Sequence, residues 1–311
     1  MTGLAFLFPG QGSQSVGMLD AYPDEGGVVS RTVDEASEAL GYDLAETISA
    51  GPETTLNRTE VTQPALLTAG VAVHRLWQAR GGASPDAMAG HSLGEYAALV
   101  VAGSLAFRDA VRLVAERARL MREAVTEGEG KMAAILGLDD ATVTDLCDQA
   151  LDAGEVTAAN FNAPGQVVVA GESAAVDTVV AAAKEAGAKR AMELPVSVPS
   201  HSPLMFTAGS RLAEALRRTD VQAPAIPVIN NVDVEAPTEP DLIRDALARQ
   251  VAHPVQWVRT IGAMRERGID TGVELGPGKV LCGLVKRIDR NLPCTPVVDE
   301  ASLQQALEQA G

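Results

Sequence analysis

Hydrophobic positions along the chain alternate between short continuous runs and longer stretches of helical period. Short runs are typical of buried strands, and longer periodic stretches are typical of helices that pack on a sheet. Before residue 128 the pattern predicts strands at Leu4–Phe8 and Asp86–Ala89, and helices at Gln63–Ala79, Glu95–Ala102 and Phe107–Ala124. This alternation favours a parallel sheet that is covered by helices.

The pattern changes after Gly128-Glu129-Gly130. The predicted order becomes strand, helix, strand, strand, helix, strand, which is the order of a ferredoxin-like unit. These elements are Lys131–Leu138, Asp140–Leu151, Val156–Asn160, Gln166–Ala170, Ser173–Ala186 and Lys189–Leu194.

The first pattern returns from Pro227 onward. It predicts strands at Val228–Asn231, Gly272–Glu274 and Pro296–Val298, and helices at Asp241–Val251, Val255–Arg267, Val280–Arg287 and Ser302–Gln309. The sequence therefore predicts a large α/β domain formed by residues 1–127 and 198–311. A small α+β subdomain, residues 128–197, interrupts it.

Composition narrows the class of protein. The chain has 311 residues, of which 46% are hydrophobic, so it can bury a large core. Its net charge of −16 argues against nonspecific binding to nucleic acid. No apolar stretch reaches the roughly 18 residues of a membrane span. The run Leu4–Phe8 lacks a basic lead-in and meets Pro9-Gly10, so it favours a strand over a signal peptide.

Three cysteines, Cys147, Cys282 and Cys294, have no spacing typical of a metal site. An odd number of cysteines without a secretion signal indicates free thiols in a reducing compartment. We therefore expect a cytoplasmic protein that does not bind membranes.

The segment Gly90-His91-Ser92-Leu93-Gly94 lies between a predicted strand and a predicted helix. A G-x-S-x-G turn in that context exposes its serine at the start of the helix, as in enzymes with a serine nucleophile. The backbone N–H of Leu93 is unpaired there and can donate to a developing oxyanion. The alternative is a tight turn whose serine only caps the helix.

A second oxyanion donor is expected from another junction between a strand and a loop. The loop Pro9-Gly10-Gln11-Gly12 follows the first strand, and the backbone N–H of Gln11 is the candidate. An ordinary glycine-rich turn explains the same residues equally well.

A serine nucleophile needs a general base, and the chain has four histidines. His74 lies in the middle of a helix, the side chain of His91 should point away from that of its neighbour, and His253 is explained by a helix end. His201 lies in an irregular segment where the subdomain returns to the large domain, and it is the base by elimination. No acid is an obvious third member. A backbone carbonyl of Gln250 or a neighbour, at the end of the helix before Pro254, can orient the imidazole instead.

Arg117 lies on the apolar side of the helix Phe107–Ala124, between Leu113 and Met121 at helical spacing. A buried guanidinium needs an anion, because an unpaired buried ion costs several kcal/mol. One possibility is an internal pair with Asp or Glu, or a side chain that extends along the edge of the core. The other is a clamp for a substrate carboxylate, which together with Ser92 predicts an acyl group that carries a carboxylate.

Five motifs occur together in the order and spacing of one family. The chain resembles the malonyl-CoA:acyl carrier protein transacylases of bacterial type II fatty-acid synthesis over nearly its whole length. The motifs are Pro9-Gly10-Gln11-Gly12, Gly90-His91-Ser92-Leu93-Gly94-Glu95, Val114-Ala115-Glu116-Arg117-Ala118, Asn160-Phe161-Asn162-Ala163-Pro164-Gly165-Gln166 and Val198-Pro199-Ser200-His201-Ser202. The resemblance continues through Asn230-Asn231-Val232-Asp233 and Glu274-Leu275-Gly276-Pro277-Gly278.

The resemblance implies an α/β-hydrolase-like core with a ferredoxin-like insertion. It assigns Ser92 as the nucleophile, His201 as acid and base, and Arg117 as the clamp for the malonyl carboxylate. It further assigns Gln250 to orient His201, and the N–H groups of Gln11 and Leu93 to the oxyanion hole. The implied reaction is ping-pong transfer from malonyl-CoA to the phosphopantetheine thiol of acyl carrier protein, with no metal or redox cofactor.

Three alternatives stay open at this point: a separate acyltransferase that serves a polyketide synthase, a serine thioesterase, and a noncatalytic scaffold that binds carrier protein. Carrier proteins of this pathway are typically acidic, so an enzyme with a charge of −16 needs a local basic patch. The candidates for that patch are Lys189, Arg190, Lys279, Lys286, Arg287 and Arg290.

Overall fold

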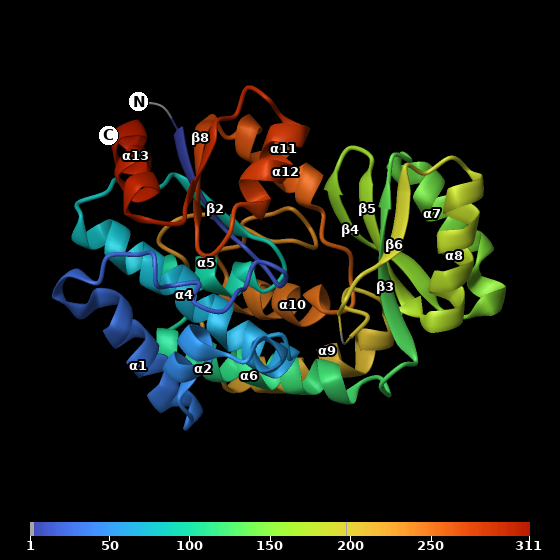
Figure 1. Ribbon diagram of the computed structural model, residues 1–311, viewed down its shortest axis with the longest axis horizontal. Coiled ribbons are helices and arrows are strands. Elements are labelled where there is room, and N and C mark those ends of the chain that lie inside the picture. Colours follow the sequence, from blue (N-terminus) through green and yellow to red (C-terminus); the bar gives the residue numbers. More distant parts are fainter. Residues whose placement is uncertain (1–2, 197) are drawn as a thin grey trace.

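Two separate β-sheets organise the computed structural model, which describes residues 3–196 and 198–311 (Figure 1). Five of the strands found in this part of the chain form a parallel sheet in the order β7-β2-β1-β8-β9. They are β1 (Gly3–Phe8), β2 (Ala87–Gly90), β7 (Val228–Ile229), β8 (Ile269–Leu275) and β9 (Cys294–Val297). The predicted parallel sheet is therefore confirmed.

The central strand β1 is buried on both faces, as expected for a parallel sheet between helices. Leu4, Phe6 and Phe8 point into one apolar core, and Ala5 and Leu7 point into the other. Helices α11 (Trp257–Glu266) and α12 (Val280–Ile288) pack against the second face. The first face is covered by α1 (Val28–Leu40), α2 (Leu44–Ala50), α3 (Glu53–Leu56), α4 (Thr59–Ala79), α5 (Gly94–Val101), α6 (Phe107–Glu123), α9 (Phe206–Arg218), α10 (Pro240–Gln250) and α13 (Glu300–Ala310).

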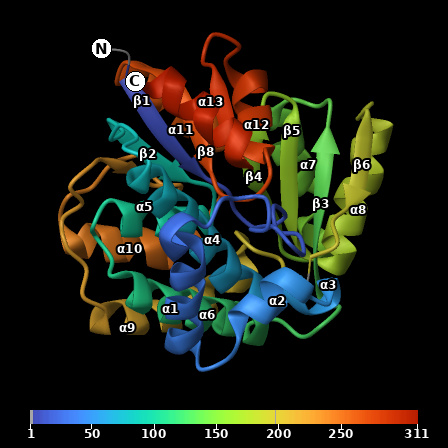
Figure 2. The same cartoon turned by 60° about the vertical axis from the view of Figure 1, so that its left-hand side comes forward.

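The second sheet is antiparallel and lies beside the first (Figures 1 and 2). Its strand order, β4-β5-β3-β6, is that of a ferredoxin-like unit, so this prediction also holds. The strands are β3 (Gly130–Leu136), β4 (Val156–Ala163), β5 (Gln166–Glu172) and β6 (Arg190–Glu193). Helices α7 (Asp140–Gln149) and α8 (Ser173–Glu185) cover one face, through a core that includes Ile135, Val143 and Val179.

The two sheets lie in different stretches of the chain. We propose that residues 128–197 form the small subdomain and that residues 1–127 and 198–311 form the large domain. The proposal is supported by the separate apolar core of the antiparallel sheet, which is shared with α7 and α8. Ser197, at the expected boundary, lies outside the described residues.

Four helices lie in segments to which the sequence pattern assigned no element: α1, α2, α3 and α9. The signal was present in α1, because its buried residues Val29, Val33 and Ala36 follow a helical period. The side chain of Asp43 caps α2 by accepting a hydrogen bond from the backbone N–H of Glu46. Short 3₁₀ turns occur at Glu25–Gly27, Leu151–Ala153 and Pro203–Met205.

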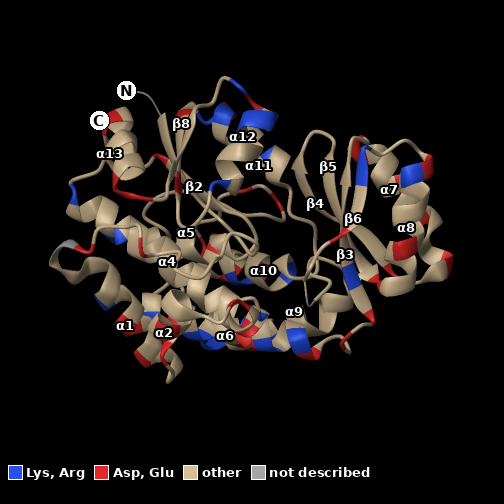
Figure 3. Cartoon of the chain, in the orientation of Figure 1, with Lys and Arg blue, Asp and Glu red and all other residues tan. Residues whose placement is uncertain are grey.

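Charged residues are spread over outer helices such as α6, α8 and α12, whereas the central strands β1 and β2 carry none (Figure 3). Among the described residues, no helix is both long and apolar enough to cross a membrane.

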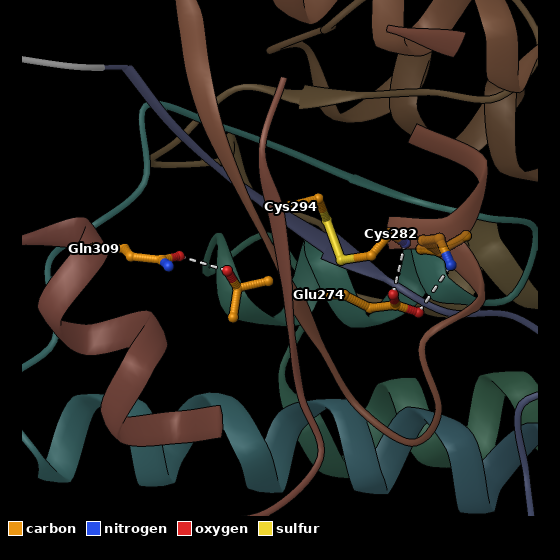
Figure 4. Close-up of a disulfide and its surroundings, with 6 residues drawn as sticks. Glu274, Cys282, Cys294 and Gln309 are labelled. Atoms are coloured by element: carbon orange, nitrogen blue, oxygen red, sulfur yellow. Dashed lines mark hydrogen bonds between the residues drawn. A yellow bond between two sulfur atoms is a disulfide. The ribbon is translucent and has the colours of Figure 1, made fainter. Parts of the chain in front are cut away.

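The expectation of three free thiols is wrong for two of the cysteines. Cys282 on α12 and Cys294 on β9 form a disulfide (Figure 4). Cys147 is free and buried. The sequence pattern did not show this pairing because the two cysteines are 12 residues apart. Only the packing of α12 against the sheet brings their Cα atoms to 5.1 Å.

The turn between β2 and α5 depends on two glycines. A Cβ atom on Gly90 would lie 1.8 Å from the carbonyl carbon of Gly94, and a Cβ on Gly94 would lie 2.1 Å from the carbonyl oxygen of Phe8. No side chain fits at either position while the strand and the helix keep this distance. The close approach therefore requires glycine at both positions.

We expect Gly90→Ala to destabilise the protein by about 4 kcal/mol, because the added methyl group forces β2 and α5 apart. Urea denaturation measures this change. The matched control is Gly262→Ala on α11, where a Cβ meets nothing within 4 Å. Alanine at this exposed position of α11 should stabilise the protein by about 0.5–1 kcal/mol. Equal stabilities of Gly90→Ala and the wild type would contradict this account of the turn.

Candidate active site

Ser92 lies in the turn between β2 and α5, with its backbone in the left-handed region at a φ of 50°. A residue other than glycine adopts this strained conformation only where the surrounding structure holds it there. The backbone N–H of Ser92 donates to Oδ1 of Asn231 at 2.6 Å, and Nδ2 of Asn231 donates to the carbonyl of Gly90 at 2.7 Å. The side chain of Asn231 thus clamps both sides of the turn.

His201 contacts Ser92, as elimination among the histidines predicted. The distance between Ser92 Oγ and His201 Nε2 is 2.7 Å. His201 also has a positive φ of 63°, and its backbone N–H donates to the carbonyl of Val251 at 2.8 Å. The serine and the histidine are therefore both held in conformations that a free chain rarely adopts.

The surroundings of His201 fix its tautomer. Its Nδ1 lies 2.8 Å from the carbonyl oxygen of Gln250 and 3.1 Å from that of His253. Carbonyl oxygens only accept, so Nδ1 carries the proton and donates to both, which leaves Nε2 free to accept the proton of Ser92 Oγ. Burial, assisted by the charge of Arg117, lowers the pKa of His201 to about 3. The imidazole is therefore neutral near pH 7, as a general base must be.

The other three histidines do not contact Ser92 Oγ through hydrogen bonds. His91 Nε2 lies 2.8 Å from Oδ1 of Asn162 on β4. His74 is buried in α4 with its ring against that of Phe6, and Nδ1 of His253 bonds to the carbonyl of Arg249. The elimination that selected His201 thus agrees with the observed contacts.

Arg117 is buried, with 2% of its surface exposed, and its guanidinium points at Ser92. Nη2 donates to Ser92 Oγ at 3.3 Å and to Oε1 of Gln250 at 3.1 Å, and Nη1 donates to Oε1 of Gln63 at 2.7 Å. Burial lowers the pKa of Arg117 below its ordinary value, but a guanidinium keeps its charge in a protein.

No carboxylate forms an ion pair with Arg117 in the described part of the chain, and its buried Nε has no hydrogen-bond partner there. The internal pair that the sequence left open is therefore absent among these residues. The guanidinium keeps donor capacity for an anion that binds beside Ser92.

Gln250 contributes to the site in two ways. Its backbone carbonyl accepts from His201, as described above. Its side chain, which is fully buried, donates from Nε2 to a carboxylate oxygen of Glu95 at 2.8 Å and to the carbonyl of Ser92 at 3.1 Å. The sequence predicted the first contact, whereas the link from Glu95 through Gln250 to Arg117 was not predicted.

Gln11 and Leu93 line a common cavity. Gln11 lies in the turn after β1, and Leu93 precedes the first residue of α5. Within residues 3–196 and 198–311, neither backbone N–H donates a hydrogen bond. Both are thus available to an oxygen atom that enters the cavity.

The cavity has a volume of about 190 Å³ and lies between the two sheets, with Ser92, His201 and Arg117 in its wall. The face of the antiparallel sheet that α7 and α8 leave uncovered contributes apolar side chains, Met132 and Val168 among them. Helix α12 contributes Val280, Leu281 and Leu284. The lining therefore combines apolar side chains with polar ones, among them Asn160, Asn162 and Gln166 besides Ser92, as in sites for small ligands.

Three polar residues of the site were not identified as such from the sequence: Gln63, Glu95 and Asn231. Each is buried, with 2% or less of its surface exposed. Gln63 lies on α4 among apolar residues, and a polar residue in such a position was the signal that could have identified it. Glu95 and Asn231 were noted only as parts of motifs.

Comparison with known proteins agrees with this geometry. Residues 5–300 match the family model of the acyl transferase domain. The chain is 53% identical over 308 residues to the malonyl CoA-acyl carrier protein transacylase of Escherichia coli (strain K12), covering 99% of this chain and 100% of the relative.

Solved structures give the same result. An acyl-carrier-protein S-malonyltransferase from Burkholderia pseudomallei superposes with a TM-score of 0.97 at 54% identity, covering 98% of this chain and 99% of that one. A malonyl-transacylase in complex with a type II PKS acyl-carrier protein has a TM-score of 0.97 at 49% identity, covering 99% of this chain and 100% of that one. The chain therefore belongs to the acyl transferase domain family and, within it, to the malonyl-CoA–acyl carrier protein transacylases.

Proposed function

We propose that this protein transfers the malonyl group of malonyl-CoA to the phosphopantetheine thiol of acyl carrier protein, through a malonyl ester on Ser92. The observation that carries the proposal is the buried Arg117 guanidinium, which lies 3.3 Å from Ser92 Oγ and has no carboxylate partner among the described residues. An acyl group on Ser92 that ends in a carboxylate supplies that partner.

In the first half-reaction, Nε2 of His201 accepts the proton of Ser92 Oγ, and the oxygen attacks the thioester carbonyl of malonyl-CoA. The N–H groups of Gln11 and Leu93 stabilise the oxyanion of the tetrahedral intermediate. The C–S bond then breaks, and His201 returns the proton to the sulfur of the departing CoA.

In the second half-reaction, the phosphopantetheine thiol of the carrier protein replaces CoA. His201 takes the thiol proton, and the sulfur attacks the carbonyl of malonyl-Ser92. The tetrahedral intermediate collapses with loss of Ser92 Oγ, which recovers its proton from His201. Each step balances with side chains and backbone groups of this chain.

The carbonyls that contact His201 and the guanidinium of Arg117 have separate roles in this mechanism. The carbonyls at the end of α10 hold the imidazole in the tautomer that accepts a proton. Arg117 holds the far end of the acyl group, so that the carbonyl carbon stays beside Ser92 Oγ and water is the minor acceptor.

A basic hollow beside the cavity is the proposed docking site for the acidic carrier protein. It is lined by Lys189 and Arg190, at the start of β6 in the antiparallel sheet, and by Arg287 on α12, which packs on the parallel sheet. Arg287 donates to Gln166, which lines the active-site cavity. A partner held there by charge places its flexible thiol arm close to Ser92.

The acceptor could also be the carrier protein of a polyketide synthase, because one close structural neighbour is a transacylase bound to such a carrier. Transfer rates to carrier proteins of both kinds test this second candidate. We also propose a cytoplasmic location, which cell fractionation followed by an assay of the transferase activity tests.

The acyl-enzyme is the first test of the proposal. After mixing with malonyl-CoA, the intact mass of the wild type should increase by one malonyl group, and that of Ser92→Ala should not change. The added mass should disappear when a thiol acceptor is supplied. A wild type that gains no malonyl mass would refute the proposed function, since a scaffold has no need for an acyl-enzyme.

Replacement of the clamp tests the choice of acyl group. Arg117→Ala should lower kcat/KM for malonyl-CoA by about 100-fold, because a charge-assisted pair is lost, while acetyl transfer is retained or improves. Arg119→Ala is the control, because Arg119 lies on the same helix but pairs with Glu116 and Glu123 at the surface. Equal losses with both acyl donors would make Arg117 a structural residue.

Charge reversal tests the docking site. Lys286→Glu combined with Arg287→Glu on exposed positions of α12 should raise the KM for acyl carrier protein by about tenfold at low salt, since the approach of an acidic partner becomes unfavourable. Arg217→Glu with Arg218→Glu at the exposed end of α9 makes the same change in net charge elsewhere. An unchanged KM in the α12 variant would remove this patch from consideration.

A further inference from the structure

We infer that Glu95 is a positioning residue that supplies the counter-charge of Arg117 in the unacylated enzyme, acting through Gln250. The inference rests on the proposed function, because it concerns the state of the clamp when no malonyl group occupies it. Among the residues that the structure describes, no other contact supplies this counter-charge to Arg117.

The connection between the two charges is a short chain of hydrogen bonds. Nη2 of Arg117 donates to Oε1 of Gln250 at 3.1 Å, and Nε2 of Gln250 donates to Oε2 of Glu95 at 2.8 Å. All three side chains are buried, with at most 2% of their surface exposed. In such a medium two opposite charges attract each other over a distance at which water would screen them.

The carboxylate of Glu95 also determines which way the amide of Gln250 points. An ionised carboxylate only accepts, so the amide NH₂ group of Gln250 must face Glu95. The amide oxygen is then directed at Arg117, where it accepts from the guanidinium. A second acceptor contact of Glu95, with the backbone N–H of Asn231 at 2.9 Å, fixes the carboxylate itself.

Other charges near the pair are already compensated. Asp233 acts on Glu95 electrostatically, but both of its carboxylate oxygens accept from Arg249, at 2.6 and 3.0 Å. His201, which also lies near Arg117, is neutral for the reasons given above. Glu95 and Arg117 therefore remain as two buried charges of opposite sign that balance each other.

Burial raises the pKa of Glu95 to about 7, and the hydrogen bonds from Gln250 and Asn231 together with the charge of Arg117 oppose this rise. Its position in the first turn of α5 also favours negative charge, because the dipole of a helix is positive at that end. The charge of Glu95 is therefore supported first by the hydrogen bonds from Gln250 and Asn231 and then by the charge of Arg117.

The arrival of a malonyl carboxylate changes this balance. Arg117 then has a direct anionic partner, and Glu95 becomes a second negative charge behind it. Glu95 therefore stabilises the clamp when it is empty and weakens its hold on malonyl when it is occupied. This suits an enzyme that must pass the acyl group on rather than store it.

Glu95→Gln removes the charge and keeps the size and the ability to accept. We expect the melting temperature of the unacylated enzyme to fall by about 5 °C, because Arg117 loses its counter-charge. In the malonyl-enzyme, the melting temperature of Glu95→Gln should lie below that of malonylated wild type by half this difference or less, since the malonyl carboxylate replaces the charge of Glu95. The acetyl-enzyme, which carries no carboxylate, should keep the full deficit.

Glu274→Gln is the matched control. Glu274 is also fully buried, burial raises its pKa to about 7 as well, and it accepts from the backbone N–H groups of Leu281 and Cys282 at the start of α12 (Figure 4). Its replacement should lower the melting temperature by the same amount in the unacylated, acetyl and malonyl forms. Intact mass after each scan checks that the acyl group is still present.

A second comparison needs no acyl group and keeps the inference testable if Glu95→Gln alone does not fold. Adding Glu95→Gln to Arg117→Met removes both charges, so it should leave the melting temperature unchanged or raise it relative to Arg117→Met. If Glu95→Gln also lowers the melting temperature of Arg117→Met by about 5 °C, the inference is overturned, because Glu95 would then act independently of Arg117. If instead the wild type gains no malonyl mass, the proposed function fails while this comparison still tests the pair.

Discussion

A positive charge is held in the wall of an apolar cavity, and the arrangement of the site depends on it. The guanidinium of Arg117 has no carboxylate partner within ion-pair distance in the described part of the chain. It is held instead by three neutral acceptors, the amide oxygens of Gln63 and Gln250 and the hydroxyl of Ser92. Its charge helps to keep His201 in the neutral form that accepts a proton. In the proposed mechanism the charge of Arg117 thus serves both to bind an acidic acyl group and to keep His201 neutral.

This arrangement requires a rigid frame. Hydration would lower the free energy of the guanidinium in any relaxed state that exposed it to water, so the packing has to prevent that relaxation. The frame is the close approach of β2 and α5 at Gly90 and Gly94, with the side chain of Asn231 across the turn. Ser92 and His201 both have positive φ angles, so the surrounding packing maintains a strained backbone at both residues. Strand β2 anchors Ser92, and the carbonyls of Gln250 and Val251 at the end of α10 hold His201.

The antiparallel sheet closes the cavity from the other side. One of its faces packs on α7 and α8, and the opposite face carries Met132 and Val168 toward the cavity. The same sheet places Lys189 and Arg190 beside Arg287 of α12. The antiparallel sheet and its loops therefore contribute part of the apolar wall of the site and all of the lining of the basic hollow except Arg287.

The sequence by itself determined the two sheets, the turn at Ser92 and the position of Arg117 on the buried side of α6, because hydrophobic period and glycine spacing are local properties. Elimination among four histidines was enough to select His201, since the other three had local explanations. The tertiary structure alone decided which groups surround Arg117. Gln63, Glu95 and Gln250 come from three different helices, and no local pattern relates them. The same holds for Cys282 and Cys294, whose pairing depends on how α12 packs beside β9.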